Sequence, residues 1–180
     1  MTEKKLEECI RNKKLSLSFW NKYTHFSILI YLLITPIILL FLHIKDLMNN
    51  EPVSLKENEI YFIITPILFA ILFFKIQNNR LKFKKVSTTL TKDELIKIIE
   101  NIGAELKWIP YLIGDNIIIV KTNPSFWSGS WGEQITIIFD KNNVLINSIC
   151  DPDKNSSLVS MGRNKKNENA LIKAIKATSR

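Results

Sequence analysis

The stretch that decides the fold is YTHFSILIYLLITPIILLFLHI, residues 23–44. Its 22 residues include no Asp, Glu, Lys or Arg, and His25 and His43 lie near its two ends. A membrane-spanning helix needs about 17–25 predominantly apolar residues. The segment therefore predicts a span, and its length disfavours the alternative of a buried core helix. No small-x-small cleavage site follows it, so we expect a retained anchor and not a signal peptide.

A second apolar stretch, IYFIITPILFAILFF, covers residues 60–74 and is also free of charged residues. Alone it is short for a span, because 15 helical residues cover only about 22 Å. A helix over residues 59–77, with the Lys75 ammonium group extended toward the headgroups, reaches about 30 Å. We therefore predict a hairpin of two spans, residues 23–44 and 59–77, within residues 23–77.

Each predicted span contains a Thr-Pro pair, Thr35–Pro36 and Thr65–Pro66. A proline inside a helix removes one backbone hydrogen bond and permits a kink, and the threonine hydroxyl can bond back to the preceding turn. We favour a packing point between two kinked helices over a gating joint, with coincidence in an Ile-rich sequence as the third interpretation. Neither predicted span holds an ionisable residue in its interior, which disfavours a transporter built from this chain alone.

The charges sort by region in a way that predicts orientation. The formal net charge is +8. Residues 1–22 carry a net +3, the connecting loop 45–59 carries −2, residues 75–85 carry +5, and residues 86–180 carry +2. Basic flanks around an acidic loop predict a multi-pass protein of the inner (cytoplasmic) membrane with both termini in the cytoplasm. Because the juxtamembrane stretches account for the positive charge, we expect no nucleic-acid partner.

After the hairpin, the sequence predicts a basic linker at residues 78–90 and a cytosolic domain at residues 91–180. Thr91 with Glu94 forms a capping box that starts a helix, and Gly103 is its expected stop. A second helix is expected near the C-terminus, capped by Asn164 or Asn167. Alternating apolar residues predict strands at residues 104–109, 117–122, 133–140 and 144–150, with a short fifth near 158–161. The links are too short for parallel crossovers, so the fold class is α+β, an antiparallel sheet of four or five strands with helices on one face.

The segment NPSFWSGSWG, residues 123–132, is the strongest candidate for a contact with a ligand or partner. It sets Phe126, Trp127 and Trp131 among small, flexible residues, a composition typical of aromatic binding loops. The alternative is that the three rings cover the core or an edge of the sheet.

Residues Cys150, Asp151 and Asp153 offer a thiol and two carboxylates close in sequence. A nucleophilic cysteine needs a base, and both histidines belong to the predicted spans. The spacing Asp151, Asp153, Asn155 resembles the start of a calcium loop but lacks its later glycine and glutamate. We therefore expect no catalytic residue, no metal and no cofactor, and the enzyme question stays open with a leaning against it.

Basic residues suggest two further surfaces. The linker residues Arg80, Lys82, Lys84 and Lys85 are expected to rest on anionic headgroups or only to set topology. The lead-in to the last helix, residues 162–167, suits either an anion or a solvated cap. An amphipathic N-terminal stretch, set apart as a basic cytosolic segment at residues 1–22, is expected on the inner membrane surface.

The run SWGEQITIIFD, ending at Asp140, continues through VLINSICDPD to SMGRNKKN, ending at Asn167. This pattern resembles the C-terminal half of small two-span bacterial membrane proteins of Bacteroidota-like genomes, over roughly residues 105–175. The resemblance implies a bacterial source and a cytosolic domain, and it implies no activity.

These observations favour a membrane-anchored cytosolic module that binds a protein partner or a small ligand, with the lipid bilayer as its other partner and a homo-oligomer compatible with the hairpin. One alternative is a subunit of a larger transport or envelope complex. A weaker one is a membrane-bound enzyme that uses the region of Cys150, Asp151 and Asp153.

Overall fold

The computed structural model describes residues 2–52, 58–123, 131–154 and 160–179 of the 180-residue chain. The chain forms two compact units. One comprises Phe26–Asn78, and the other joins Met1–His25 to Asn79–Arg180. We call them the helical unit and the sheet unit.

The helical unit is built from α2 (Phe19–Met48) and α3 (Glu59–Arg80), whose ends extend into the sheet unit. Within the described residues, these are the two helices long and apolar enough to cross a membrane. Only 11% and 6% of their most apolar windows are buried, which is not the pattern of core helices in a soluble domain. Their large apolar side chains instead face outward, as a lipid environment requires.

Two contacts link α2 and α3 near opposite ends of the helical unit. The rings of Phe26 and Phe74 lie with centroids 5.7 Å apart. His43 Nε2 lies 3.0 Å from Glu59 Oε1. Pro36 and Pro66 lie inside α2 and α3, as the sequence predicts, while the proposed kinks and their role stay predictions.

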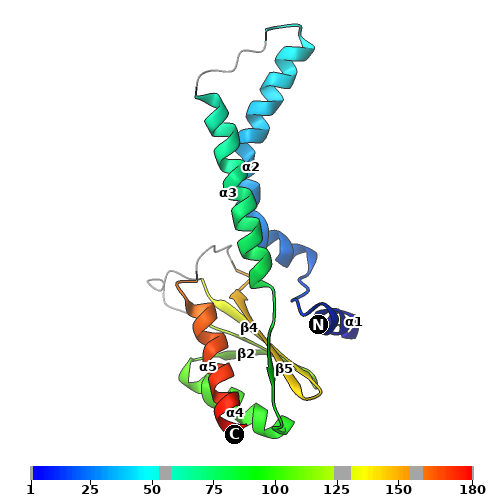
Figure 1. Cartoon of the computed structure of the whole chain (residues 1–180), viewed down its shortest axis with the longest axis vertical. Helices are drawn as coiled ribbons and strands as arrows, with labels where there is room; N and C mark the ends of the chain where they lie inside the picture. Colours follow the sequence, from blue (N-terminus) through cyan, green and yellow to red (C-terminus); the bar gives the residue numbers. More distant parts are fainter. Residues whose placement is uncertain (1, 53–57, 124–130, 155–159, 180) are drawn as a thin grey trace. The chain divides into compact units, whose positions relative to one another are not determined.

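The sheet unit contains a five-stranded, wholly antiparallel sheet in the order β1-β5-β4-β3-β2 (Figure 1). Its strands are β1 (Lys84–Ser87), β2 (Ile109–Ile113), β3 (Ile117–Lys121), β4 (Glu133–Asp140) and β5 (Asn143–Cys150). The central hairpin β4–β5 pairs along its whole length, from Glu133 with Cys150 to Asp140 with Asn143. The predicted α+β class with an antiparallel sheet is confirmed.

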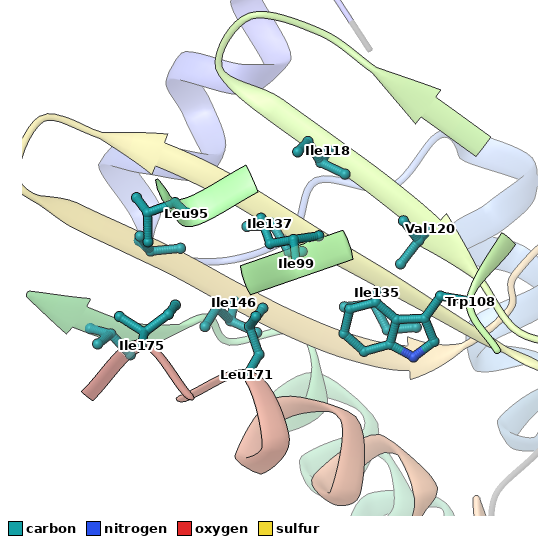
Figure 2. Close-up of a cluster of buried hydrophobic side chains, with 12 residues drawn as sticks. Leu95, Ile99, Trp108, Ile118, Val120, Ile135, Ile137, Ile146, Leu171 and Ile175 are labelled. Carbon is teal, nitrogen blue, oxygen red and sulfur yellow. The ribbon is translucent and has the colours of Figure 1, made fainter. Parts of the chain in front are cut away.

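Helices α4 (Lys92–Glu105) and α5 (Arg163–Thr178) supply apolar side chains to one face of the sheet. Figure 2 shows Leu95 and Ile99 from α4, and Leu171 and Ile175 from α5, together with the inward isoleucines of the strands. Alternation along the strands places every second residue in this core, because successive side chains point to opposite faces. The residues in this cluster are Val86, Leu95, Ile99, Trp108, Ile118, Val120, Ile135, Ile137, Val144, Ile146, Leu171 and Ile175.

Two strands differ from the sequence prediction. Residues 84–87, predicted as part of a basic linker, form edge strand β1, because Val86 reaches the core and the backbone pairs with β5. The strand predicted at residues 104–109 begins instead at Ile109 and forms β2. Half of the predicted short strand at 158–161 lies outside the described residues, and the other half, Ser160 and Met161, is not in a strand.

The predicted capping box of α4 is present, with the Thr91 N–H donating to Glu94 Oε2 at 2.8 Å and the Glu94 N–H donating to Thr91 Oγ1. The predicted stop at Gly103 is wrong, because α4 continues to Glu105. Gly103 is buried against the Trp108 side chain, and the backbone N–H of Trp108 donates to the Gly103 carbonyl at 2.7 Å. The glycine therefore gives room to an indole ring and does not end the helix.

The N-terminal segment belongs to the sheet unit, whereas residues 1–22 were predicted to form a separate basic segment. Helix α1 (Glu3–Asn12) leads into a short extended piece that pairs with residues 81–83. The Leu15 N–H donates to the Leu81 carbonyl at 2.8 Å, and the Phe83 N–H donates to the Lys13 carbonyl at 2.9 Å. Cys9 and Leu15 are buried, so these two side chains pack against protein.

Candidate functional site

The aromatic loop predicted as the contact surface lies mostly outside the described residues. Phe126 and Trp127 belong to residues 124–130, which are not among the residues that the structure describes. Trp131 is described, and about half of its surface is exposed. The role of the three aromatic residues in binding stays a prediction.

Edge strand β2, with the sequence Ile-Pro-Tyr-Leu-Ile, presents an exposed apolar surface on the sheet. Ile109 is 51% exposed, Tyr111 is 59% exposed and Ile113 is 73% exposed. In the described part of the chain, β2 pairs with β3 on one side and with no strand on the other. An uncharged, exposed edge is a surface that another chain can cover.

The opposite edge of the sheet is different in kind. Strand β1 is only four residues long, begins Lys84-Lys85, and is preceded by residues that pair with the N-terminal segment. Short length and lysines are ordinary means of keeping a sheet edge from pairing with other chains. The contrast singles out β2 as the accessible edge.

An apolar cavity of about 270 Å³ opens between α4 and the β2–β3 edge. Ile96 and Ala104 line it from α4, Trp108 closes one end, and Pro110 and Ile113 contribute from the edge itself. Among the described residues that line it, Glu100 is the charged one. Small-molecule sites usually enclose about 300–1,000 Å³, so this cavity suits one large apolar side chain better than a cofactor.

Sequence reasoning missed this site because it placed the strand five residues too early. Pro110 was the available signal: proline within a strand is confined to edges and bulges, since it cannot donate to the ladder. The register of β2 indeed shifts between Pro110 and Leu112.

Three of the four predicted membrane-surface residues, Arg80, Lys82 and Lys84, line a second pocket of about 460 Å³. Its other wall is the first half of α5, which contributes Lys165. The fourth, Lys85, is not part of this lining, because β1 alternates and Lys85 pairs with Leu145 on the opposite face.

Glu168 is the acidic residue in the lining of this basic pocket. Burial raises its pKa above the ordinary range, against the lowering effects of the Ser148 N–H and the Lys84 charge. The Ser148 N–H donates to Glu168 Oε1 at 3.0 Å. The carboxyl is thus engaged by the protein and offsets only part of the surrounding positive charge.

The two carboxylates of the Cys150 region bind a lysine. Lys121 Nζ lies 2.9 Å from Asp151 Oδ1 and 2.5 Å from Asp153 Oδ2, and 4.0 Å from the centroid of the Tyr111 ring. Hydrogen bonding by Lys121 lowers the pKa of Asp153, while burial opposes this effect. For Lys121 itself, burial alone would lower the pKa, but the bonds to Asp153 and Asp151 outweigh it and raise the pKa. This arrangement is an ion-pair cluster that ties β3 to the segment after β5.

Comparisons with known proteins identify no relative of this chain. No family model, curated protein or solved structure matches this sequence. Within the described residues, no group of three His, Cys, Asp or Glu side chains is arranged to hold a metal ion. The assignment of function therefore depends on the surfaces themselves, above all on the β2 edge with its apolar cavity and on the basic pocket.

The beginning of α5 also differs from its predicted role as a capped, solvated end. Gly162 occupies the N-cap position, and Arg163 Nε lies 3.0 Å from the buried carboxylate Oε1 of Glu133. Thr122 Oγ1 donates a short hydrogen bond to the other oxygen of Glu133. Asn164 and Asn167, the predicted caps, lie within α5 instead of before it. Both are buried, and their amides are hydrogen-bonded to the Ser148 hydroxyl.

Proposed function

We propose that this chain is a membrane-anchored binding module whose sheet unit captures an apolar segment of a partner protein at the β2 edge. The observation that carries the proposal is the apolar cavity beside an uncharged, exposed edge strand. Ile113 is both exposed and part of the cavity wall. A partner side chain inserted there would be enclosed by Trp108 and α4, while the flanking residues of the partner would cover Ile109 and Tyr111.

The helical unit supplies location in this proposal. Its two apolar helices hold the module at the cytoplasmic membrane, and the basic flanks place both termini in the cytoplasm. The binding edge is then presented to partners that are themselves at or near the membrane. Confinement to one surface raises the effective concentration of such partners, so a single-anchor contact of modest affinity suffices.

The test fills the cavity from an exposed position on α4 and leaves the residues of the core cluster unchanged. Ala104 lies on the exposed side of α4 and lines the cavity, so Ala104→Trp places an indole in the space that a partner side chain would occupy. Asn101→Trp is the matched control, because Asn101 is exposed on the same helix but does not line the cavity. Both variants add the same ring to a solvent-facing helical position.

The measurement is photo-crosslinking in native cells from a benzoylphenylalanine at position 113 of the full chain. We expect a discrete crosslinked product that persists in Asn101→Trp and disappears in Ala104→Trp. A product that survives Ala104→Trp unchanged, or that forms equally from a probe at exposed Met161, would contradict binding at this edge.

A further inference from the structure

The basic pocket beside α5 brings together four basic side chains, and the one acidic side chain among the described lining residues, Glu168, offsets only part of their positive charge. Lys82, Lys84 and Lys165 line it together with Arg80, and none of the three lysines forms an ion pair with a described residue. Two other basic side chains of the sheet unit are paired, Lys121 with Asp151 and Arg163 with Glu133. The pocket is therefore an electropositive concavity with room for an anion.

The volume and the lining of the pocket favour a phosphate ester over a free inorganic ion. A volume of about 460 Å³ exceeds what a single inorganic ion fills and falls within the range of small-molecule sites. Its lining is also polar, since it includes Ser160 and Asn169, while the Ser148 hydroxyl is already bonded to the side chains of Asn164 and Asn167. A bound phosphate is usually surrounded by several ammonium and guanidinium groups together with neutral polar groups.

The position of the pocket along the chain, directly after α3, indicates that the phosphate belongs to the membrane surface. Arg80 is the last residue of α3 and lies six residues after Phe74, the end of the uncharged apolar run. Six helical residues rise about 9 Å. A bilayer has a hydrocarbon core about 30 Å thick and a total thickness of about 40–45 Å, so its headgroups begin within that distance of the apolar run.

We propose that this pocket binds the phosphate of an anionic phospholipid headgroup. Lys84 and Lys165 contact the phosphate from β1 and α5, and Arg80 and Lys82 contribute from the chain that leaves α3. The inference depends on the membrane placement of α3 proposed above and is independent of partner binding at β2. Lipid bound here would fix β1 and α5 of the sheet unit to the membrane surface, in addition to the tether supplied by the chain itself.

The test uses a matched pair of double variants of the full chain in an uncharged detergent. Lys84→Gln with Lys165→Gln removes two charges from the pocket. Lys85→Gln with Lys173→Gln removes the same charge from exposed positions on the same two elements, outside the pocket. Retention of added phosphatidylglycerol, phosphatidylcholine or glycerol phosphate is measured by native mass spectrometry, and circular dichroism verifies that each variant is folded.

We expect the unaltered chain to retain phosphatidylglycerol in preference to phosphatidylcholine, whose choline the lysines repel. The pocket variant should bind phosphatidylglycerol roughly 30-fold more weakly, at about fivefold per lysine, and the control variant within about twofold of the unaltered chain. Equal weakening by both variants, or no preference between the two lipids, would overturn the site. Glycerol phosphate bound as tightly as phosphatidylglycerol would overturn the lipid as its source. Loss of the β2 crosslink would affect neither result.

Discussion

Asn167 lies inside α5, and its side-chain amide joins two other elements of the sheet unit. Its Oδ1 accepts from Trp108 Nε1 at 3.4 Å, and its Nδ2 donates to Ser148 Oγ at 3.3 Å. Ser148 in turn lies 3.2 Å from Asn164 Oδ1. A buried polar network of this kind is stabilising only while every member has a partner. Its loss would therefore affect the helix, the sheet and the indole together.

We predict that Asn167→Ala lowers the free energy of unfolding of the sheet unit by about 1–3 kcal/mol, because it leaves the buried Trp108 indole N–H without its partner and removes the bond to the Ser148 hydroxyl. Asn169→Ala is the control, since Asn169 is exposed on the same helix and should change stability by less than about 0.5 kcal/mol. Chemical denaturation followed by tryptophan fluorescence measures both. Equal effects of the two substitutions would show that the network adds nothing to stability.

The identity of these asparagines illustrates the limit of sequence reasoning at this scale. An asparagine ahead of an apolar helix is a good cap by local rules, and the prediction followed those rules. What places Asn167 inside the helix is contact with Trp108, 59 positions earlier, and with Ser148, 19 positions earlier. Partners that distant in the chain leave no local pattern.

Elements whose signals are local were predicted well. The capping box of Thr91 and Glu94 marks the start of α4, and the turn at residues 140–143 joins β4 and β5 with nearly the predicted bounds. The two edge strands were not. Lys84 and Lys85 made β1 look like a linker, because its membership in the sheet is decided by β5, about 60 residues later. The basic pocket was likewise predicted only in part. Arg80 and Lys84 were predicted to share a surface, but Lys165 joins them only in the folded chain.

The reactivity of the Cys9 thiol reports whether the N-terminal segment is packed within the sheet unit. Its thiol is buried, and burial raises its pKa, with the Ser16 N–H at 3.2 Å acting in the opposite direction. A buried, protonated thiol reacts slowly with maleimide. We predict that Leu15→Ala, in a Cys150→Ser background of the full chain, accelerates labelling of Cys9 at least about tenfold, because a buried leucine is lost from the segment that shields it.

The matched substitution is Phe19→Ala, which also removes a large apolar side chain but from a position that is 77% exposed. Labelling of Cys9 should then stay within about twofold of the unaltered rate. Rapid labelling of Cys9 without any substitution would indicate that residues 1–25 do not pack with the sheet unit.

For the whole molecule, the distribution of charge is more informative than its total. The formal charge of +8 is accounted for by the stretches next to the predicted spans, +3 in residues 1–22 and +5 in residues 75–85. Three of the residues in the second stretch also line the basic pocket, so one set of side chains is proposed to set orientation and to bind a headgroup. The remaining sheet-unit sequence is nearly balanced, which leaves the uncharged β2 edge free of electrostatic repulsion toward a partner.

Orientation is the property of the whole chain on which both proposals depend. We predict that alkaline phosphatase, a reporter active only outside the cytoplasm, is inactive when fused after Arg180 and active when inserted after Asn50, in the loop between α2 and α3. The physical reason is the excess of Lys and Arg on both flanks of the hairpin, which resists translocation, against a loop with four acidic and two basic residues. The opposite pattern of activity would place the β2 edge and the basic pocket outside the cytoplasm. Equal activity at both positions would mean that α3, the candidate span between them, does not cross the membrane. The lipid inference would then fail, because Arg80 would no longer follow a span.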